Sequence, residues 1–326
     1  MARRFTEDEL IAKLFAPLAG AAGLGLYDDA ALLPASNNPM VATTDALVAG
    51  VHFFEGDPPG LIAKKALRVN LSDLAAKGAE PVGFLLAVAL PPDWTNDWLA
   101  AFAAGLGEDA LAYRCPLLGG DTVSTPGPFT LSITALGEAP EGRFVARTTA
   151  QAGDAVYISG TVGDAALGLR LRRDGALARR LSARAREHLL ERYLLPRPRL
   201  ALTPALRLHA TAAMDVSDGL AGDLAKLARA SKLGARILLS SVPLSDAARE
   251  AIAFDPSLFE VAMTGGDDYE ILCSAGAGAA QFEAAAQASG APCAKIGELI
   301  EGDQETVFLD ERESIIHFNA LSFSHF

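Results

Sequence analysis

Residues 65–91 read KALRVNLSDLAAKGAEPVGFLLAVALP, and they contain a helix pattern followed by a strand pattern. Three leucines recur at the i, i+4, i+7 spacing that defines one face of a helix: Leu67, Leu71 and Leu74. This spacing predicts a helix over about 60–77, and the apolar run after it predicts a strand over 82–90. The stretch therefore indicates a fold that mixes helices with strands.

A polar stripe lies beside the leucine face of this helix and consists of Asn70, Asp73 and Lys77. A stripe of this kind is more often solvated than functional. It also suits the wall of a polar cavity, so both interpretations of Asp73 stay open at this point.

Helix and strand patterns alternate outward from this stretch. Helices are predicted over about 7–18, 95–113, 163–173, 182–195, 199–208, 220–230 and 277–289. Strands are predicted over about 40–44, 129–137, 155–160, 235–240, 269–274 and 304–309. The mixture predicts the α/β or α+β class. A cluster of Pro140, Gly142 and Gly153 predicts a domain boundary near 140–152.

Length and composition limit the function classes. The 326 residues suggest two domains, and half of them are apolar, so the chain can bury a core. Acidic residues outnumber basic ones by 40 to 28, for a net charge of −12. Nucleic acid, which requires a basic surface, is therefore not an expected partner.

Several features predict a cytoplasmic protein that does not enter a membrane. The longest apolar run is far too short to cross a bilayer. The N-terminus has no apolar signal region, and Thr6 and Glu9 instead form a T-x-x-E capping box. The three cysteines are widely spaced and are expected to be ordinary buried thiols.

Aspartates recur beside glycine, serine or threonine, where one element gives way to the next. They stand in the segments YDDA (Asp28, Asp29), TTDAL (Asp45), NLSDL (Asp73), LLGGDT (Asp121), MDVSDGL (Asp215, Asp218) and TGGDDYE (Asp267, Asp268). Each segment also has a structural interpretation. Asp218 is suited to cap the helix that follows it, GGD is suited to a turn, and a DD pair is often solvated.

Taken together, the aspartates and hydroxyls are the oxygen ligands that Mg²⁺ prefers. Zinc is disfavoured because the five histidines show no paired spacing and the cysteines form no C-x-x-C. No Walker A motif and no kinase-type glycine loop is present, so any phosphate chemistry must use another architecture.

The ordered set of motifs resembles the thiamine-monophosphate kinase family over essentially the whole chain. The matching segments are GLYDDAALL, VATTDALVAGVHF, the opening stretch, LLGGDT, GDAVYISGTVGDAALGL, RPRLALTPALRL, MDVSDGLAGDLAKL and TGGDDYEIL. The resemblance implies a two-domain fold like that of aminoimidazole-ribonucleotide synthetase. It implies an Mg/ATP-binding domain over 1–145, which pairs through its sheet in a homodimer, and a domain over 146–326 that completes the site. ATP, thiamine monophosphate and several Mg²⁺ ions are the implied ligands.

The resemblance also implies roles for individual residues. Metal ligands are expected at Asp29, Asp45, Asp73, Asp121, Asp215 and Asp218, with the hydroxyls of Thr43 and Thr44. Nucleotide contacts are expected at Tyr113, Gly120, Asp121, Arg147 and Ser217. Thiamine monophosphate contacts are expected at His52, Asp267 and Phe323. The nucleophile would be an anionic phosphate oxygen of the substrate, so no general base is expected.

Two alternative functions stay open, and one residue departs from the family pattern. The chain could be another ATP-dependent enzyme of the superfamily, such as a purine cyclo-ligase, or a nucleotide-binding homologue without activity. The departure is Tyr27, where the family usually has glycine before the aspartate pair. Either this loop keeps φ below zero at Tyr27, or it accepts strain beside the site. For the ring itself, a packing role is expected, and the alternative is a place at the mouth of the nucleotide pocket.

Overall fold

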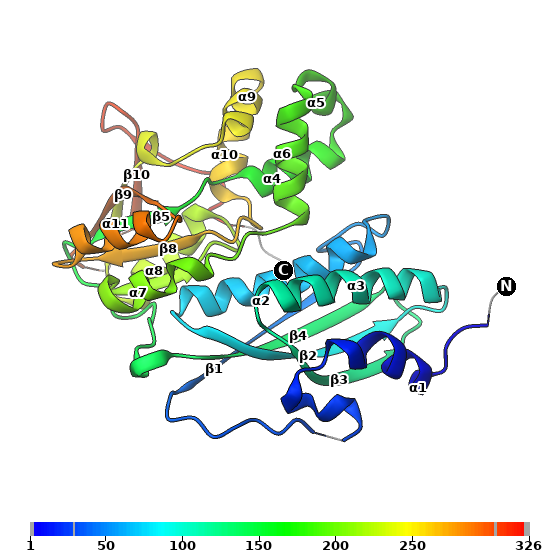
Figure 1. Cartoon of the computed structure of the whole chain (residues 1–326). Coiled ribbons are helices and arrows are strands. Elements are labelled where there is room, and N and C mark those ends of the chain that lie inside the picture. The colour runs from blue at the N-terminus through cyan, green and yellow to red at the C-terminus, as the bar shows by residue number, and fades with distance from the viewer. Residues whose placement is uncertain (1–2, 29, 303–304, 323–326) are drawn as a thin grey trace. The chain divides into compact units, whose positions relative to one another are not determined.

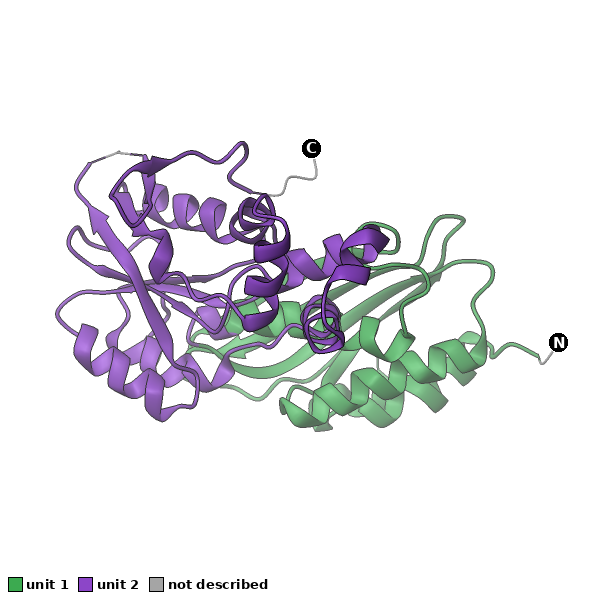
Figure 2. Ribbon diagram, turned by 90° about the horizontal axis from the view of Figure 1, so that it is seen from above, with its two compact units in different colours: residues 1–74, 79–142 green, residues 75–78, 143–326 purple. Residues whose placement is uncertain are grey.

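The computed structural model of the chain describes residues 3–28, 30–302 and 305–322 (Figure 1). These residues form two compact units (Figure 2). Unit 1 comprises residues 1–74 and 79–142, and unit 2 comprises residues 75–78 and 143–326. None of the described helices combines the length and the apolar character that crossing a membrane requires.

Unit 1 is built on a sheet whose four described strands lie in the order β1-β4-β2-β3. The strands are β1 (Met40–Val48), β2 (Glu80–Leu90), β3 (Leu117–Ser124) and β4 (Thr130–Glu138). Strand β4 is antiparallel to both β1 and β2, whereas β2 and β3 are parallel. Helices α2 (Pro59–Ala76) and α3 (Asn96–Ala112) cover one face of this sheet (Figure 1).

The two faces of the sheet differ because side chains alternate along each strand. On β4, Leu131, Ile133 and Ala135 are buried, whereas the residues between them are half-buried. On the face away from the helices, Leu85 and Val123 are 40% and 50% exposed. The predicted leucine face of α2 is confirmed, since Leu67, Leu71 and Leu74 are fully buried. With this face α2 contributes to the hydrophobic core of unit 1.

The N-terminal segment is more irregular than the predicted helix over 7–18. It consists of α1 (Glu7–Leu10), a π turn (Ile11–Phe15) and a 3₁₀ turn (Ala16–Leu18), followed by a second 3₁₀ segment (Ala21–Leu26). Pro17 stands inside the 3₁₀ turn, where it cannot donate a main-chain hydrogen bond. The predicted capping box is confirmed: Glu9 N donates to Thr6 Oγ1, and Thr6 N donates to Glu9 Oε2.

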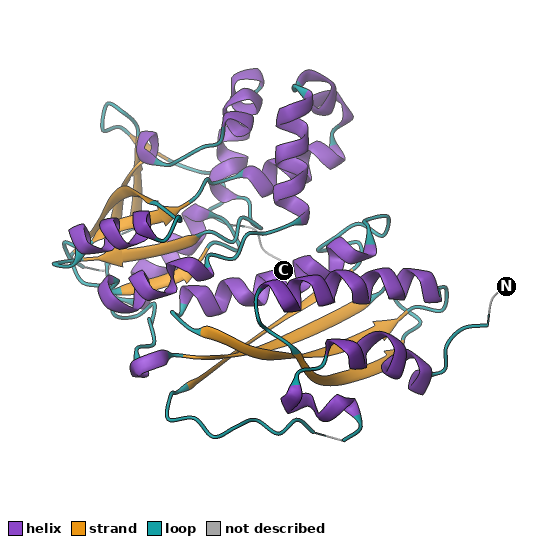
Figure 3. Ribbon diagram, in the orientation of Figure 1, coloured by secondary structure: helices purple, strands orange, loops and turns teal. Residues whose placement is uncertain are grey.

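Unit 2 contains strands and helices that pack together (Figure 3). Its described strands form a mixed sheet in the order β11-β10-β7-β9-β5-β8-β6. The strands are β5 (Ala155–Ser159), β6 (Ala212–Asp215), β7 (Gly234–Leu238), β8 (Ile271–Ala275), β9 (Cys293–Ile300), β10 (Thr306–Leu309) and β11 (Ile315–Ile316). The helices are α4 (Asp164–Arg173), α5 (Gly175–Arg180), α6 (Ala183–Leu194), α7 (Thr203–His209), α8 (Leu220–Ala230), α9 (Asp246–Phe254), α10 (Leu258–Thr264) and α11 (Ala279–Ala288). Short 3₁₀ turns span Leu200–Leu202 and Leu239–Ser241, and a further one, Pro140–Gly142, ends unit 1.

The end of the opening stretch, residues 75–78, belongs to unit 2 and not to unit 1. Lys77 Nζ donates to the carbonyl of Ala213 at 2.6 Å, and Arg207 Nη1 donates to the carbonyl of Gly78 at 2.9 Å. Val145 N also donates to the carbonyl of Lys77. Lys77 is therefore not a solvated residue of the polar stripe, because it is bonded to β6.

Candidate functional site

The predicted site residues are distributed over both units, and each group is described within its own unit. In unit 1, β1 presents Thr43 and Asp45 to the helix-covered face, because these residues pair with the buried Ala135 and Ile133 of β4. The Thr43 hydroxyl donates a short hydrogen bond to Oδ2 of Asp73 on α2. The structure therefore gathers Thr43, Asp45 and Asp73 at one place between β1 and α2.

The electrostatics of this group fit a divalent cation. Burial, and to a lesser extent the nearby Asp73 carboxylate, raise the pKa of Asp45 to about 6. Two carboxylates and a hydroxyl form an all-oxygen donor set, which is the type that Mg²⁺ takes. A cation between these carboxylates would offset the repulsion that raises the Asp45 pKa.

Asn70 lies one helical turn before Asp73 and is completely buried. Its Nδ2 donates to the carbonyl of Ala66 at 3.0 Å, which fixes the orientation of the amide. Among the described residues its Oδ1 has no hydrogen-bond partner. The polar stripe predicted from the sequence is thus a buried wall at Asn70 and not a solvated surface.

The opposite face of the sheet carries other predicted ligands. Asp121 on β3 pairs with Ala87, which in turn pairs with Ser132 of β4, so these residues share the open face. Thr44 also lies there, with its hydroxyl 3.1 Å from the carbonyl of Ile133 and from Thr134 Oγ1. A groove of about 660 Å³ runs over this face and is lined by Asp28, Gly120, Asp121, Ser132 and Thr134 among others.

Adjacent residues of one strand therefore face different sides of the sheet, with Thr43 and Asp45 on one side and Thr44 on the other. Nowhere in the described parts of the chain do three or more His, Cys, Asp or Glu side chains come together as a metal site. The proposed ligand set therefore needs water, substrate oxygens or further residues to complete it. A role for Asp121 and Thr44 in metal binding stays a prediction.

His52 and Tyr113 lie at the ends of elements of unit 1. His52 Nδ1 accepts a hydrogen bond from Val48 N at 3.0 Å, which assigns the ring proton to Nε2. Lys65, which is buried, donates to the His52 carbonyl at 3.1 Å. Tyr113 follows α3, and the Arg68 guanidinium lies 5.7 Å from the centre of its ring. The ring of His52 is therefore held in one orientation by the turn after β1.

In unit 2, Asp215 is the last residue of β6, and the loop after this strand carries Ser217 and Asp218. The main-chain N–H groups of Ser217 and Asp218 both donate to Oδ2 of Asp223 at 2.9 Å. Lys226 Nζ donates to Asp218 at 2.5 Å and to Asp223 at 2.8 Å. The suggestion that Asp218 caps the following helix is wrong, because Gly219 is the N-cap residue and Asp223 holds the loop.

Asp223 and Lys226 were not selected from the sequence. Their i, i+3 spacing on α8 is the only sequence signal for this contact. It is a weak signal, because the same spacing is common on solvated helices.

A second loop, residues 264–270, packs against the first through the main chain. Asp267 N donates to the carbonyl of Ser217 at 2.9 Å, and Tyr269 N donates to the carbonyl of Val216 at 2.8 Å. A Cβ at Gly266 would lie 2.1 Å from Ser217 O, so only glycine permits this approach. Ser217, Asp218 and Asp267 are therefore brought together in unit 2.

Arg147 lies elsewhere in unit 2. Its carbonyl accepts a hydrogen bond from Ser231 Oγ at 3.1 Å, at the C-terminal end of α8, and its side chain is exposed. Ser217 precedes the N-terminal end of the same helix, whose 11 residues span about 16 Å. The structure does not place the main chain of Arg147 beside Ser217, so the nucleotide contact of Arg147 stays a prediction.

Comparison with known proteins identifies the family. The model of the AIR synthase related protein, N-terminal domain, matches residues 27–139, and that of the C-terminal domain matches residues 151–310. The thiamine-monophosphate kinase of Caulobacter vibrioides is 42% identical over 321 residues, which covers 94% of this chain and 88% of the relative. This chain belongs to the thiamine-monophosphate kinase family.

Solved structures of the thiamine-monophosphate kinase family have the same fold. The crystal structure of the enzyme from Stenotrophomonas maltophilia has a TM-score of 0.79 at 40% identity, over 88% of this chain and 90% of that chain. The structure of AaThiL complexed with AMPPCP and TMP has a TM-score of 0.76 at 27% identity, over 98% of this chain and 94% of that chain. The predicted AIR synthase-like fold is thereby confirmed.

The remaining residues that the comparison with the thiamine-monophosphate kinase family singles out are Asp29, Phe323 and Tyr27. Asp29 and Phe323 lie outside the described residues. Tyr27 has a φ of −97°, which confirms the first of the two options for this loop. Left-handed backbone occurs instead just upstream, at Leu24 and Leu26, with φ of 51° and 61°. The expected packing role of the Tyr27 ring is wrong in the single chain, because the turn leaves the residue 89% exposed.

The Asp45 pKa predicts how Mg²⁺ binding by this group of carboxylates would change with pH. Only the carboxylate form binds a cation, so protons compete with Mg²⁺ below the raised pKa of about 6. The apparent Mg²⁺ affinity is expected to fall by roughly tenfold per pH unit below that value and to level off above it. The Mg²⁺ concentration for half-maximal ADP release, measured on both sides of this pKa, tests the prediction. A constant concentration would remove Asp45 from the metal site.

Proposed function

We propose that this protein transfers the γ-phosphoryl group of ATP to thiamine monophosphate, which yields thiamine diphosphate and ADP. The observation that carries the proposal is the 42% identity to a thiamine-monophosphate kinase over 94% of the chain. The likeness to a structure complexed with AMPPCP and TMP supports both substrates. The oxygen-donor group in unit 1 supplies the chemistry that phosphoryl transfer requires.

Thr43, Asp45 and Asp73 are the residues that would hold Mg²⁺, with Asp215 and Asp218 as further candidates in unit 2. Bound Mg²⁺ supplies neutralisation of charge on the phosphates. From the loops of unit 2, Ser217 is proposed to contact the nucleotide and Asp267 to contact thiamine monophosphate. His52, held by Val48 N with its proton on Nε2, is suited to donate a hydrogen bond to the substrate.

The reaction needs no general base from the chain. A phosphate oxygen of thiamine monophosphate is anionic at neutral pH and can attack directly. The obstacle is the repulsion between two anions, so the protein contributes alignment and electrostatic stabilisation.

The active form is proposed to be a homodimer that pairs through the open face of the unit 1 sheet. This face carries exposed apolar side chains, Leu85 and Val123, next to the polar residues Thr44 and Asp121. Exposed apolar area on a sheet face is typical of an interface. In such a dimer the groove beside Asp121 would lie at the junction of two chains.

The assay that tests the proposed function follows ADP release with Mg²⁺ and ATP. Thiamine monophosphate is expected to support turnover, whereas thiamine, hydroxymethylpyrimidine phosphate and formylglycinamidine ribonucleotide are expected to support none. Chelation of Mg²⁺ with EDTA should abolish the activity, and adding Mg²⁺ back should restore it. Turnover with formylglycinamidine ribonucleotide but not with thiamine monophosphate would favour the cyclo-ligase alternative. Binding of ATP without turnover on any substrate would favour the inactive homologue.

A further inference from the structure

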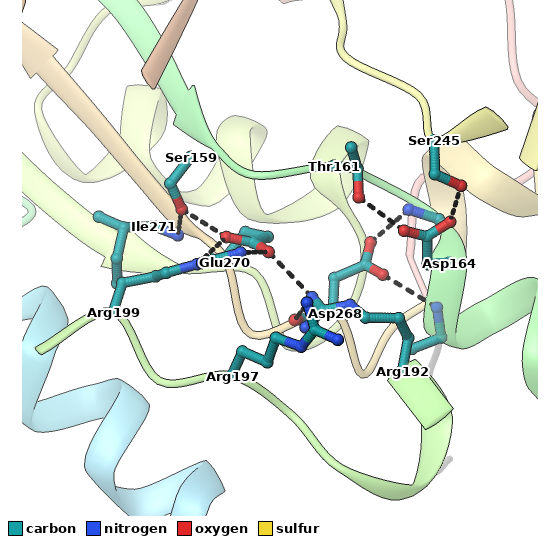
Figure 4. A network of polar contacts seen from close by, with 12 residues as sticks. Ser159, Thr161, Asp164, Arg192, Arg197, Arg199, Ser245, Asp268, Glu270 and Ile271 are labelled. Carbon is teal, nitrogen blue, oxygen red and sulfur yellow. Dashed lines mark hydrogen bonds and ion pairs between the residues drawn. The ribbon is translucent and has the colours of Figure 1, made fainter. Parts of the chain in front are cut away.

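A buried polar network includes Asp268 and Glu270 (Figure 4), and Asp268 directly follows Asp267 in the chain. Its members Ser159, Arg192, Asp268 and Glu270 are at most 2% exposed. Burying ionised groups is costly unless each is paired, so a network of this kind needs a reason beyond filling space. The network holds an unusual stretch of main chain, residues 267–269.

The main chain on both sides of Asp268 is in the left-handed region. Asp267 has a φ of 75° and Tyr269 has a φ of 52°, and neither residue is glycine. Residues other than glycine keep this conformation only when their surroundings impose it. Asp267 is the residue proposed to contact thiamine monophosphate, so the strained main chain lies at the substrate position.

Asp268 is held from two directions. Its carboxylate accepts hydrogen bonds from Gly163 N at 2.6 Å and from Ala165 N at 3.2 Å, at the start of α4. Burial raises the pKa of this carboxyl, and the two N–H donors oppose that rise. Its main-chain carbonyl accepts from Arg192 Nη2 of α6 at 3.1 Å. The side chain and the main chain of Asp268 are thus tied to two different helices.

Glu270 does not depend on Arg192 for a partner. Its carboxylate also accepts from Arg199 Nε at 2.6 Å and from Ser159 Oγ at 2.6 Å. Arg192 Nη2 lies 2.9 Å from Glu270 Oε1, but Arg192 Nε and Nη1 have no partner among the described residues. Unpaired buried donors lower stability, so stability alone gives little reason for an arginine here.

We propose that Arg192 and Asp268 are positioning residues for the binding of thiamine monophosphate. They fix the left-handed main chain around Asp267, which keeps Asp267 hydrogen-bonded to Ser217 and its carboxylate directed to the substrate. This inference rests on the proposed function, in which Asp267 contacts thiamine monophosphate. Neither residue touches the reacting atoms, so their effect is on KM and not on the chemical step.

The variant Arg192→Met tests this role, because methionine fills the space while Glu270 keeps Arg199 and Ser159. The KM for thiamine monophosphate is expected to rise by roughly tenfold, with kcat and the KM for ATP within about twofold of wild type. Arg197→Met is the matched control, since Arg197 forms an exposed ion pair with Glu191. It should leave all three parameters unchanged.

A double-mutant cycle separates positioning from a general structural effect. If Arg192 acts through Asp267, Arg192→Met should raise the KM no further in an Asp267→Ala background. Faster hydrogen exchange at the amides of Asp267 and Tyr269, which are bonded to Ser217 and Val216, is also expected in Arg192→Met. Should Arg192→Met fail to fold by circular dichroism, Arg192→Lys replaces it, with a smaller rise in KM expected.

The outcomes for the inference and for the proposed function are distinct. Wild-type protein that releases no ADP with thiamine monophosphate would overturn the proposed function. Active wild-type protein with an unchanged KM in Arg192→Met would overturn only the positioning role. If Arg192→Met lowered kcat and thermal stability together, and its effects added to those of Asp267→Ala in the double mutant, the role of Arg192 would likewise be purely structural.

Discussion

Replacement of Asp73 by Asn is expected to lower kcat by about two to three powers of ten while the protein stays folded. The substitution is nearly isosteric, so the Thr43 hydroxyl can still donate to the side-chain oxygen at position 73. What is lost is one of the two carboxylates that would hold Mg²⁺ beside β1. The kcat for ADP release at saturating Mg²⁺, ATP and thiamine monophosphate is the measurement.

The same variant also tests the assignment through thermal stability, which most inactivating substitutions would lower. Burial and then the Asp73 carboxylate raise the Asp45 pKa, so without metal the ionisation of Asp45 lowers stability as the pH rises toward about 6, and Asp73 adds to that loss. At neutral pH and without Mg²⁺, Asp73→Asn should therefore unfold at a higher temperature than wild type. Glu108→Gln, which removes an exposed partner of Lys64, is the control and should change neither property. Wild-type kcat in Asp73→Asn would contradict the metal assignment.

Glu270→Gln is expected to lower the free energy of unfolding by about 3–5 kcal/mol. Glu270 is fully buried and accepts from Arg192 and Arg199, with only Arg199 partly exposed. A neutral amide leaves these cations without a buried anion, and its NH₂ group is a donor where only an acceptor fits. Urea denaturation followed by far-UV circular dichroism measures the change.

The matched control for Glu270→Gln is Glu191→Gln. Glu191 also pairs with an arginine, Arg197, but both side chains are about half exposed. Its loss is expected to change the free energy of unfolding by less than about 1 kcal/mol. A similar small change in both variants would show that the buried network contributes little to folding.

The strongly periodic elements were predictable from the sequence because a helix of full length repeats its apolar face several times. The leucine face of α2 and the capping box of α1 are examples. Strands β3, β6, β9 and β11 were not predicted. Strand β3 contains Gly119, Gly120 and Asp121, which are residues that strands disfavour.

Helices α5, α9 and α10 were also missed. They are short, and their small buried faces offer fewer periodic positions than α2 does. Their place is decided by packing against neighbouring helices and not by local propensity. The continuous helix predicted over 7–18 was wrong because a local residue interrupts an otherwise helical pattern: Pro17 lies inside it.

The sequence by itself determined the family, the class of fold and the oxygen-rich chemistry, since these depend on residue types and their order. Only the tertiary structure decided which of these residues meet. Strand geometry turned Thr43 and Asp45 to one face of the sheet and Thr44 to the other. Contacts between residues far apart in sequence hold Asp267 against Ser217 and tie Asp268 to Arg192. No local pattern encodes such contacts, because they form only when the sheet and the helices pack together.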